Sequence, residues 1–187
     1  NNNRLLYLKD SYGDENFKLY AVNRDGHEQK LLTPFDDVRV QVIDELEERE
    51  DEIIIIMNKN KKEVFDPYRL NIETGELELL YENPGNITRW MTDHEGNLRL
   101  ALVADGVNET LLHRKTEQDP FDTVYSLSFK ETVKPLFFTF DNKNIYALSN
   151  VGRDKLALVE YDLGLGQEIG QPLFIHKHVD VMNANYS

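Results

Sequence analysis

Apolar residues in this 187-residue chain fall into short runs that are separated by polar turns. Residues 38–43, Val-Arg-Val-Gln-Val-Ile, alternate with a period of two, which predicts a strand with one buried face. Residues 53–57, Ile-Ile-Ile-Ile-Met, are a continuous apolar run that suits a strand buried on both faces. No segment of useful length has helical periodicity, so the pattern predicts an all-β protein.

A strand–turn–strand pattern recurs along the chain. In residues 140–149, Phe-Asp-Asn-Lys-Asn-Ile-Tyr-Ala-Leu-Ser, an Asp begins a polar turn and an apolar strand follows. Residues 91–102 repeat this order, and Asp93 and Asp141 are 48 positions apart. The corresponding strands of successive repeats begin at intervals of 45 to 48 residues, near Leu5, Ile53, Leu98 and Ile145. Repeats of about this length predict four-stranded β-propeller blades.

The predicted fold is therefore an all-β propeller of about four four-stranded antiparallel blades in a single segment, residues 1–187. The blades span approximately residues 4–33, 38–81, 87–129 and 133–175, and residues 178–183 start a further blade. Two arrangements stay open: an arc of a larger propeller, or a four-bladed ring closed by pairing residues 179–182 beside residues 5–9. An arc has open strand edges, through which self-association is expected.

The charge of the chain excludes one class of partner. Its 34 acidic and 21 basic residues give a formal net charge of −13. We expect no nucleic-acid partner, because phosphate backbones are bound by basic surfaces. Residues 44–52 hold seven acids and one base, a run that is typical of a solvated loop. No apolar run approaches the roughly 20 residues of a membrane helix, so we expect no membrane partner either.

Composition narrows the chemistry further. The chain has no Cys, which excludes disulfides, thiolate nucleophiles and Cys-based zinc sites. It begins Asn-Asn-Asn-Arg, without an initiator Met or a signal-peptide pattern, so we expect it to be trimmed from something longer. The expected protein is soluble, and its localisation, cytoplasmic or periplasmic, is left open.

The sequence contains no recognisable catalytic motif. It has no Gly-x-Ser-x-Gly elbow, phosphate loop or dinucleotide fingerprint, so we assign no catalytic residue and expect no cofactor. Arg89 and Trp90 lie on the expected innermost strand of the third blade. Because innermost strands line the central channel of a propeller, one of the two should face the channel and the other should face a neighbouring blade.

A metal site is the weaker alternative. His176, His178 and Asp180 are two residues apart in turn, so on a strand they would share one face. A His-x-His pair can bind zinc when a third ligand is available. The competing and more common interpretation is a polar stretch that joins two blades.

Residues 137–146, Phe-Phe-Thr-Phe-Asp-Asn-Lys-Asn-Ile-Tyr, and residues 149–154, Ser-Asn-Val-Gly-Arg-Asp, carry a resemblance to a known family. They resemble the blade pattern in the N-terminal propeller of prolyl oligopeptidase family serine peptidases, above all the bacterial dipeptidyl aminopeptidase/acylaminoacyl peptidase branch. Residues 5–16 and 19–23 fit the same pattern, and the resemblance covers nearly the whole chain.

Members of that family carry the propeller, often of seven or eight blades, over a C-terminal α/β-hydrolase domain with the Ser-Asp-His triad. The resemblance implies a non-catalytic propeller that gates and filters short peptides for a hydrolase domain absent from this chain. The implied partners are the hydrolase domain of the same parent chain and short peptides. A Tol-type or WD-type propeller that scaffolds proteins is the alternative, and a closed four-bladed domain with a channel-bound ion is a third hypothesis.

Overall fold

A computed structural model describes residues 4–10, 13–46, 49–128 and 130–185. The predictions made for residues 1–3, and for residues 47–48 of the acidic loop, therefore lie outside the described residues. Within the described ranges the chain forms strands and turns and no helix, which confirms the predicted all-β class.

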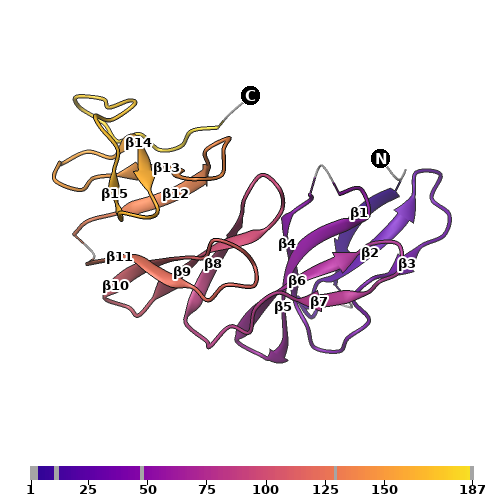
Figure 1. Ribbon diagram of the computed structural model, residues 1–187. Coiled ribbons are helices and arrows are strands. Elements are labelled where there is room, and N and C mark those ends of the chain that lie inside the picture. The colour runs from indigo at the N-terminus through magenta and orange to yellow at the C-terminus, as the bar shows by residue number, and fades with distance from the viewer. Residues whose placement is uncertain (1–3, 11–12, 47–48, 129, 186–187) are drawn as a thin grey trace. The chain divides into compact units, whose positions relative to one another are not determined.

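Fifteen strands are found in these ranges, and they form four antiparallel sheets (Figure 1). The first sheet contains β1 (Arg4–Lys9), β2 (Lys18–Asn23) and β3 (Lys30–Leu31). The second contains β4 (Val40–Asp44), β5 (Glu52–Lys61), β6 (Val64–Asn71) and β7 (Leu77–Leu79). In both sheets consecutive strands are neighbours, as in a propeller blade.

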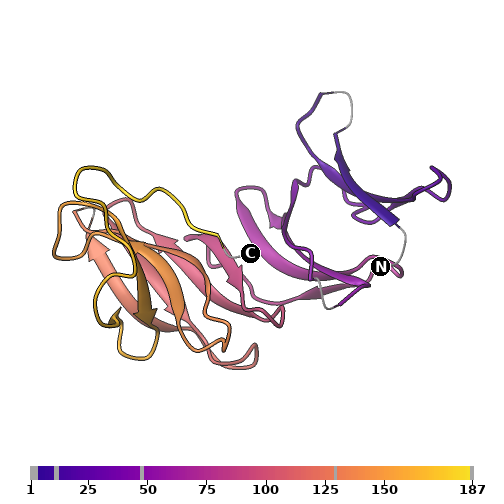
Figure 2. The same cartoon turned by 90° about the horizontal axis from the view of Figure 1, so that it is seen from above.

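The third and fourth sheets repeat this meander (Figure 2). The third contains β8 (Ile87–Thr92), β9 (Leu98–Ala104), β10 (Asn108–His113) and β11 (Asp122–Ser128). The fourth contains β12 (Val133–Phe138), β13 (Ile145–Ser149), β14 (Ala157–Asp162) and β15 (Gln167–Glu168). One three-stranded and three four-stranded sheets match the predicted strand order, and the predicted propeller class is confirmed.

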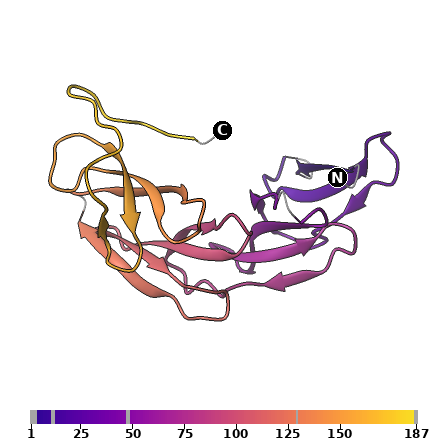
Figure 3. The ribbon, with the colours of Figure 1, turned by 45° about the horizontal axis from the view of Figure 1, so that its top comes forward.

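Among the described residues after β15, none forms a further strand. Residues 178–183 have bends and no regular secondary structure, and the Val181 N–H donates to the Leu156 carbonyl, 3.0 Å away, beside the fourth sheet. This segment is drawn in yellow in Figure 3. The further blade at 178–183, and the choice between an arc and a four-bladed ring, stay predictions.

The chain divides into two compact units, residues 1–86 and residues 87–187, which we call unit 1 and unit 2. Each unit holds two sheets with one apolar core. The core of unit 1 is mainly aliphatic and includes Leu19, Val40, Ile53, Ile55, Met57 and Leu70. The core of unit 2 mixes aliphatic with aromatic side chains and includes Leu100, Leu111, Tyr125, Phe138, Ile145 and Tyr161.

Strand β5 shows why a continuous apolar run predicted a strand that is buried on both faces. Ile54 and Ile55 are successive residues and so point to opposite faces of the second sheet, yet both have 0% exposure. Burial on both faces explains an apolar run without alternation. Pro67 of β6 lies opposite Ile56, one residue before the ladder to β7 begins at Tyr68.

Candidate functional site on the first strands of the third and fourth sheets

The two predicted channel residues lie side by side on β8 but differ in environment. Trp90 is 6% exposed and packs against Phe121, with ring centroids 6.2 Å apart. The Arg114 guanidinium lies 4.8 Å from the same Phe121 ring, so the indole belongs to a packed aromatic and cationic cluster of the third sheet. Arg89 is exposed. Which of the two faces a channel stays a prediction.

Arg89 connects two sheets of unit 2. Its Nη1 donates to the carbonyl of Pro135 on β12, at 3.3 Å. Beneath it lies an apolar gap of about 10 Å³ lined by Trp90, Leu111 and Pro135 among others. That is about the space of one water molecule, so the gap is a packing defect and holds no ligand.

A larger polar pocket of about 280 Å³ opens beside the β8–β9 turn. Its lining combines the acids Asp93, Glu95 and Glu117 with the bases Arg99 and Lys115. A buried network around Arg99 forms part of this lining. Arg99 Nη1 donates to Asp93 Oδ2 at 3.3 Å and to the Asn142 carbonyl at 2.8 Å.

The same guanidinium also orders the neighbouring strand. Arg99 Nε donates to the Arg114 carbonyl at 3.2 Å, and Nη2 lies 3.0 Å from His113 Nε2. The pKa of His113 is lowered to about 4, mainly by burial of the imidazole and next by the positive charge of Arg99. His113 is therefore neutral near pH 7 and can accept the hydrogen bond from Arg99.

Asp93 is a structural carboxylate in this arrangement. Its Oδ1 accepts hydrogen bonds from the Glu95 and Asn97 backbone N–H groups, at 3.0 and 2.9 Å. With Arg99 on Oδ2, both oxygens are engaged and the side chain is only 3% exposed. Because both oxygens are engaged with groups of the turn and with Arg99, we assign Asp93 to holding the turn.

The second predicted turn aspartate differs. Asp141 is exposed, and hydrogen bonds from the Thr139 hydroxyl and from Lys143 lower its pKa. In the backbone pattern Thr139, and not Asp141, is the counterpart of Asp93. The Thr139 N–H donates to Asn144 O as the Asp93 N–H donates to Asn97 O, both at 2.9 Å.

The three residues of the metal hypothesis are placed as follows. The rings of His176 and His178 are 6.1 Å apart, and the His178 N–H donates to His176 Nδ1 at 3.2 Å. Asp180 Oδ1 accepts a hydrogen bond from the Leu156 N–H, at 2.8 Å. Among the described residues no three His, Cys, Asp or Glu side chains are grouped as a metal site.

Sequence reasoning did not find the Arg99 network. Its only sequence signal is an Arg between apolar neighbours in the run Leu-Arg-Leu-Ala-Leu, residues 98–102. An arginine there needs partners, because a charged group in an apolar strand is costly when unpaired. The partners come from turns of two different sheets, and no local pattern encodes them.

Comparison with known proteins gives one curated relative with clear sequence similarity. Dipeptidyl aminopeptidase BIII of Pseudoxanthomonas mexicana is 30% identical over 167 residues, which are 87% of this chain and 24% of the relative. The chain thus spans about a quarter of that relative's length. No family model matches the chain.

Solved structures share the fold at lower identity. Puromycin hydrolase superposes with a TM-score of 0.65 and 13% identity, covering 92% of this chain and 29% of that one. TolB from Acinetobacter baumannii gives a TM-score of 0.56 and 15% identity, with coverage of 89% and 40%. In the part of the chain that the structure describes, no helix is long and apolar enough to cross a membrane.

Proposed function

We propose that the chain is the non-catalytic propeller portion of a longer serine peptidase of the prolyl oligopeptidase family. In that role it gates the active site and filters short peptide substrates for an α/β-hydrolase domain of the same parent chain. The observation that supports this is the 30% identity to a dipeptidyl aminopeptidase over 87% of the chain.

The physical basis of the filter is a ring of stiff blades around an opening of fixed size. A peptide that passes the opening reaches a site from which bulk water and folded proteins are excluded. Stiffness requires that neighbouring blades be bonded as well as packed. In unit 2 Tyr125 Oη donates to the Val133 carbonyl at 2.6 Å, and Arg89 donates to the Pro135 carbonyl. Side chains of the third sheet are therefore hydrogen-bonded to the backbone of the fourth.

Activity measurements on two forms of the protein test the proposal. The chain of residues 1–187 is expected to hydrolyse no peptide, because it contributes no catalytic residue. The full-length protein is expected to cleave short peptides, and kcat/KM should fall steeply as the peptide becomes longer. Hydrolysis by the pure chain, or a rate that is independent of peptide length in the full-length protein, would overturn the proposal.

A protein-binding scaffold is the second candidate, and the likeness to TolB supports it. The parent's sequence beyond residue 187 discriminates between the two. A Gly-x-Ser-x-Gly elbow within an α/β-hydrolase pattern favours the peptidase. A parent that has propeller repeats and no such elbow favours the scaffold.

A further inference from the structure

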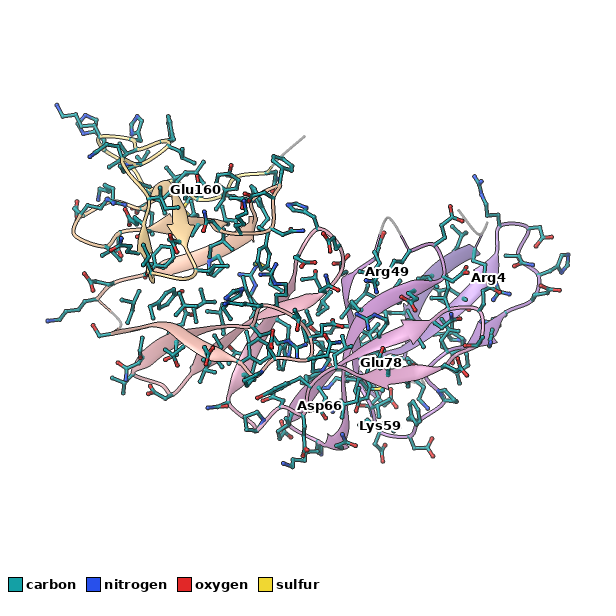
Figure 4. All side chains as sticks on the ribbon, in the orientation of Figure 1. Arg4, Arg49, Lys59, Asp66, Glu78 and Glu160 are labelled. Carbon is teal, nitrogen blue, oxygen red and sulfur yellow. The ribbon has the colours of Figure 1, made fainter. Side chains whose placement is uncertain are left out.

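The strands of unit 2 separate positive from negative side chains according to their position in the sheet. The first two strands of each sheet, β8, β9, β12 and β13, contain three bases and no acid: Arg89, Arg99 and Lys134. The last two strands, β10, β11, β14 and β15, contain five acids and no Lys or Arg: Glu109, Asp122, Glu160, Asp162 and Glu168. Glu160 is labelled on the fourth sheet in Figure 4.

The first two strands of these two sheets are thus positive within a chain whose net charge is −13. The turns after β8 and β12 carry Glu95 and Asp141, so the positive sign belongs to the strands themselves. In a propeller the first strand of each blade lies nearest the axis and the last strand lies outermost. The acids therefore gather on the outer strands and the bases near the axis.

Two of the three bases are available to a ligand. Arg99 is paired with Asp93 and its side chain is 12% exposed, so its charge is compensated. Arg89 and Lys134 are exposed, and among the described residues neither has an ion-pair partner. Arg89 of β8 is anchored to the Pro135 carbonyl, and Lys134 precedes Pro135 on β12, so the two bases come from the first strands of the third and fourth sheets.

Protection of the sheet edge is the competing explanation, because β8 and β12 are edge strands and exposed bases discourage edge pairing. Two observations count against it. Bases are not a constant feature of the edge strands, because β1 carries Arg4 and Lys9 whereas β4, the first strand of the second sheet, carries Asp44 and no base. Arg89, moreover, is held against the neighbouring sheet by its bond to Pro135, whereas an edge-protecting side chain needs only to reach solvent.

We propose that Arg89 and Lys134 form a cationic wall that favours short peptides with a carboxylate, and disfavours cationic ones, on their way to the active site. The proposal rests on the proposed function and adds a substrate class to it. Guanidinium and ammonium groups bind carboxylates through charge-assisted hydrogen bonds. The acidic outer strands of unit 2 add to the effect, because they repel anions from the outer part of its two sheets.

The expected selectivity is modest, because both side chains are exposed. Exposed ion pairs contribute little each, which corresponds to roughly a two- to fivefold change in kcat/KM for each charge removed. Screening acts over about 8 Å at physiological salt, so the preference should weaken in 0.5 M salt.

The test uses the full-length protein and a set of short peptides that are identical except for Glu, Gln or Lys at one uncleaved position. An amidated Glu peptide and a Gln peptide with a free C-terminus separate the two sources of a carboxylate. We expect the Glu peptide to be cleaved faster than the Lys peptide. The double variant Arg89→Gln with Lys134→Gln should remove most of that difference, while Lys62→Gln, an exposed base in the β5–β6 turn, should not.

Two failures are distinguishable. If the protein cleaves peptides with no charge preference, or if the double variant keeps the preference, the cationic wall is wrong and the peptidase role stands. If it cleaves none of the peptides, the peptidase role fails, and fluorescence anisotropy of the labelled peptides then tests the wall by binding. Equal binding of the Glu and Lys peptides would overturn the wall in that case.

Discussion

Unit 1 and unit 2 each join two β-sheets, but they do so with different bonds. In unit 1 the sheets share an aliphatic core and one backbone bond, from the Val40 N–H to the Phe17 carbonyl at 3.0 Å. Among the described residues, Arg4 and Lys30 of the first sheet also reach the side chain and the carbonyl of Glu73, a residue whose side chain is 40% exposed.

In unit 2 side chains of the third sheet and its turns donate to the backbone and turn of the fourth. Arg99 reaches Asn142, Tyr125 reaches Val133, and Arg89 reaches Pro135. The apolar contacts of a core have no preferred direction, whereas each hydrogen bond requires a particular distance and angle between donor and acceptor. The difference indicates that unit 1 tolerates small shifts between its sheets and that the blade-to-blade geometry of unit 2 depends on single polar side chains.

Arg99→Ala is expected to have the largest effect. The change leaves the Asp93 carboxylate buried without its cation and removes the bond to Asn142 O, which costs about 3–5 kcal/mol of unfolding free energy. The only Trp of the chain, Trp90, lies in unit 2, so its fluorescence in a urea titration reports that unit. Far-UV circular dichroism reports both units.

The matched control for this change is in unit 1. Arg49, labelled in Figure 4, pairs with Glu52, and both side chains are 35% exposed. Arg49→Ala should therefore cost less than about 1 kcal/mol. Equal effects of the two substitutions would contradict the contrast between the units.

Gly166→Ala is expected to come next, because it acts on the same junction through the backbone. Gly166 has a φ of +65°, and an added Cβ would lie 2.4 Å from the Val124 carbonyl oxygen of the third sheet. We expect about 1–2 kcal/mol from the left-handed conformation and about 1–3 kcal/mol from the clash.

Gly170→Ala separates these two contributions, again by urea unfolding. Gly170 has nearly the same φ, +66°, and nothing within 4 Å of an added Cβ. It should lose only the conformational part. If both variants were equally destabilised, the close approach between the third and fourth sheets would contribute nothing.

Much of the fold could be predicted from local pattern. The prediction of a strand at residues 98–104 coincides with β9, and residues 145–149 coincide with β13. Both runs are apolar and are bounded by polar turns, so the sequence contains both the element and its ends. The last strand of the fourth sheet was predicted less well. The fourth blade was expected to extend to residue 175, but its last strand is only β15 at Gln167–Glu168, followed by a single bridge from Leu158 to Phe174.

The candidate site could be predicted only in part, because its partners are distant in sequence. The pattern placed Arg89 and Trp90 on β8, and the structure has them there. It could not give Pro135 as the acceptor for Arg89, or Asn142 for Arg99, because 46 and 43 residues separate these pairs. The sequence repeat aligned Asp93 with Asp141, whereas the backbone hydrogen bonds of the two turns align Asp93 with Thr139. The sequence could not reveal this, because the side-chain oxygen of an Asp or of a Thr can hold such a turn.

Tyr125→Phe is a smaller change at the junction of unit 2. It removes the buried hydroxyl that donates to the Val133 carbonyl and leaves that carbonyl without this donor, at a cost of about 1–3 kcal/mol. Tyr68→Phe in unit 1 is the control, because the Tyr68 hydroxyl accepts a 3.2 Å bond from Asn60 within one sheet. It should cost about 1 kcal/mol or less in the same titration. A larger loss for Tyr68→Phe would reverse the contrast.

The smallest expected effect is a pH dependence of unit 2 through His113. Burial and the charge of Arg99 lower the pKa of this imidazole from 6.5 to about 4. Between pH 6.5 and 4 the unfolded chain binds the proton and the folded one does not, so this contribution to stability is present above pH 6.5 and is lost as the pH falls. His113 is only half buried, so we expect a loss on the order of 1 kcal/mol at pH 5 after solvent screening.

The experiment compares urea midpoints of Trp90 fluorescence at pH 7 and 5 for the wild type and for His113→Asn. The comparison isolates the contribution of His113 to stability, because the carboxylates titrate alike in both proteins. The variant should lose less stability on acidification than the wild type. An identical loss in the two proteins would mean that the Arg99 network does not hold His113 neutral and that the polar junction of unit 2 is looser than its distances indicate.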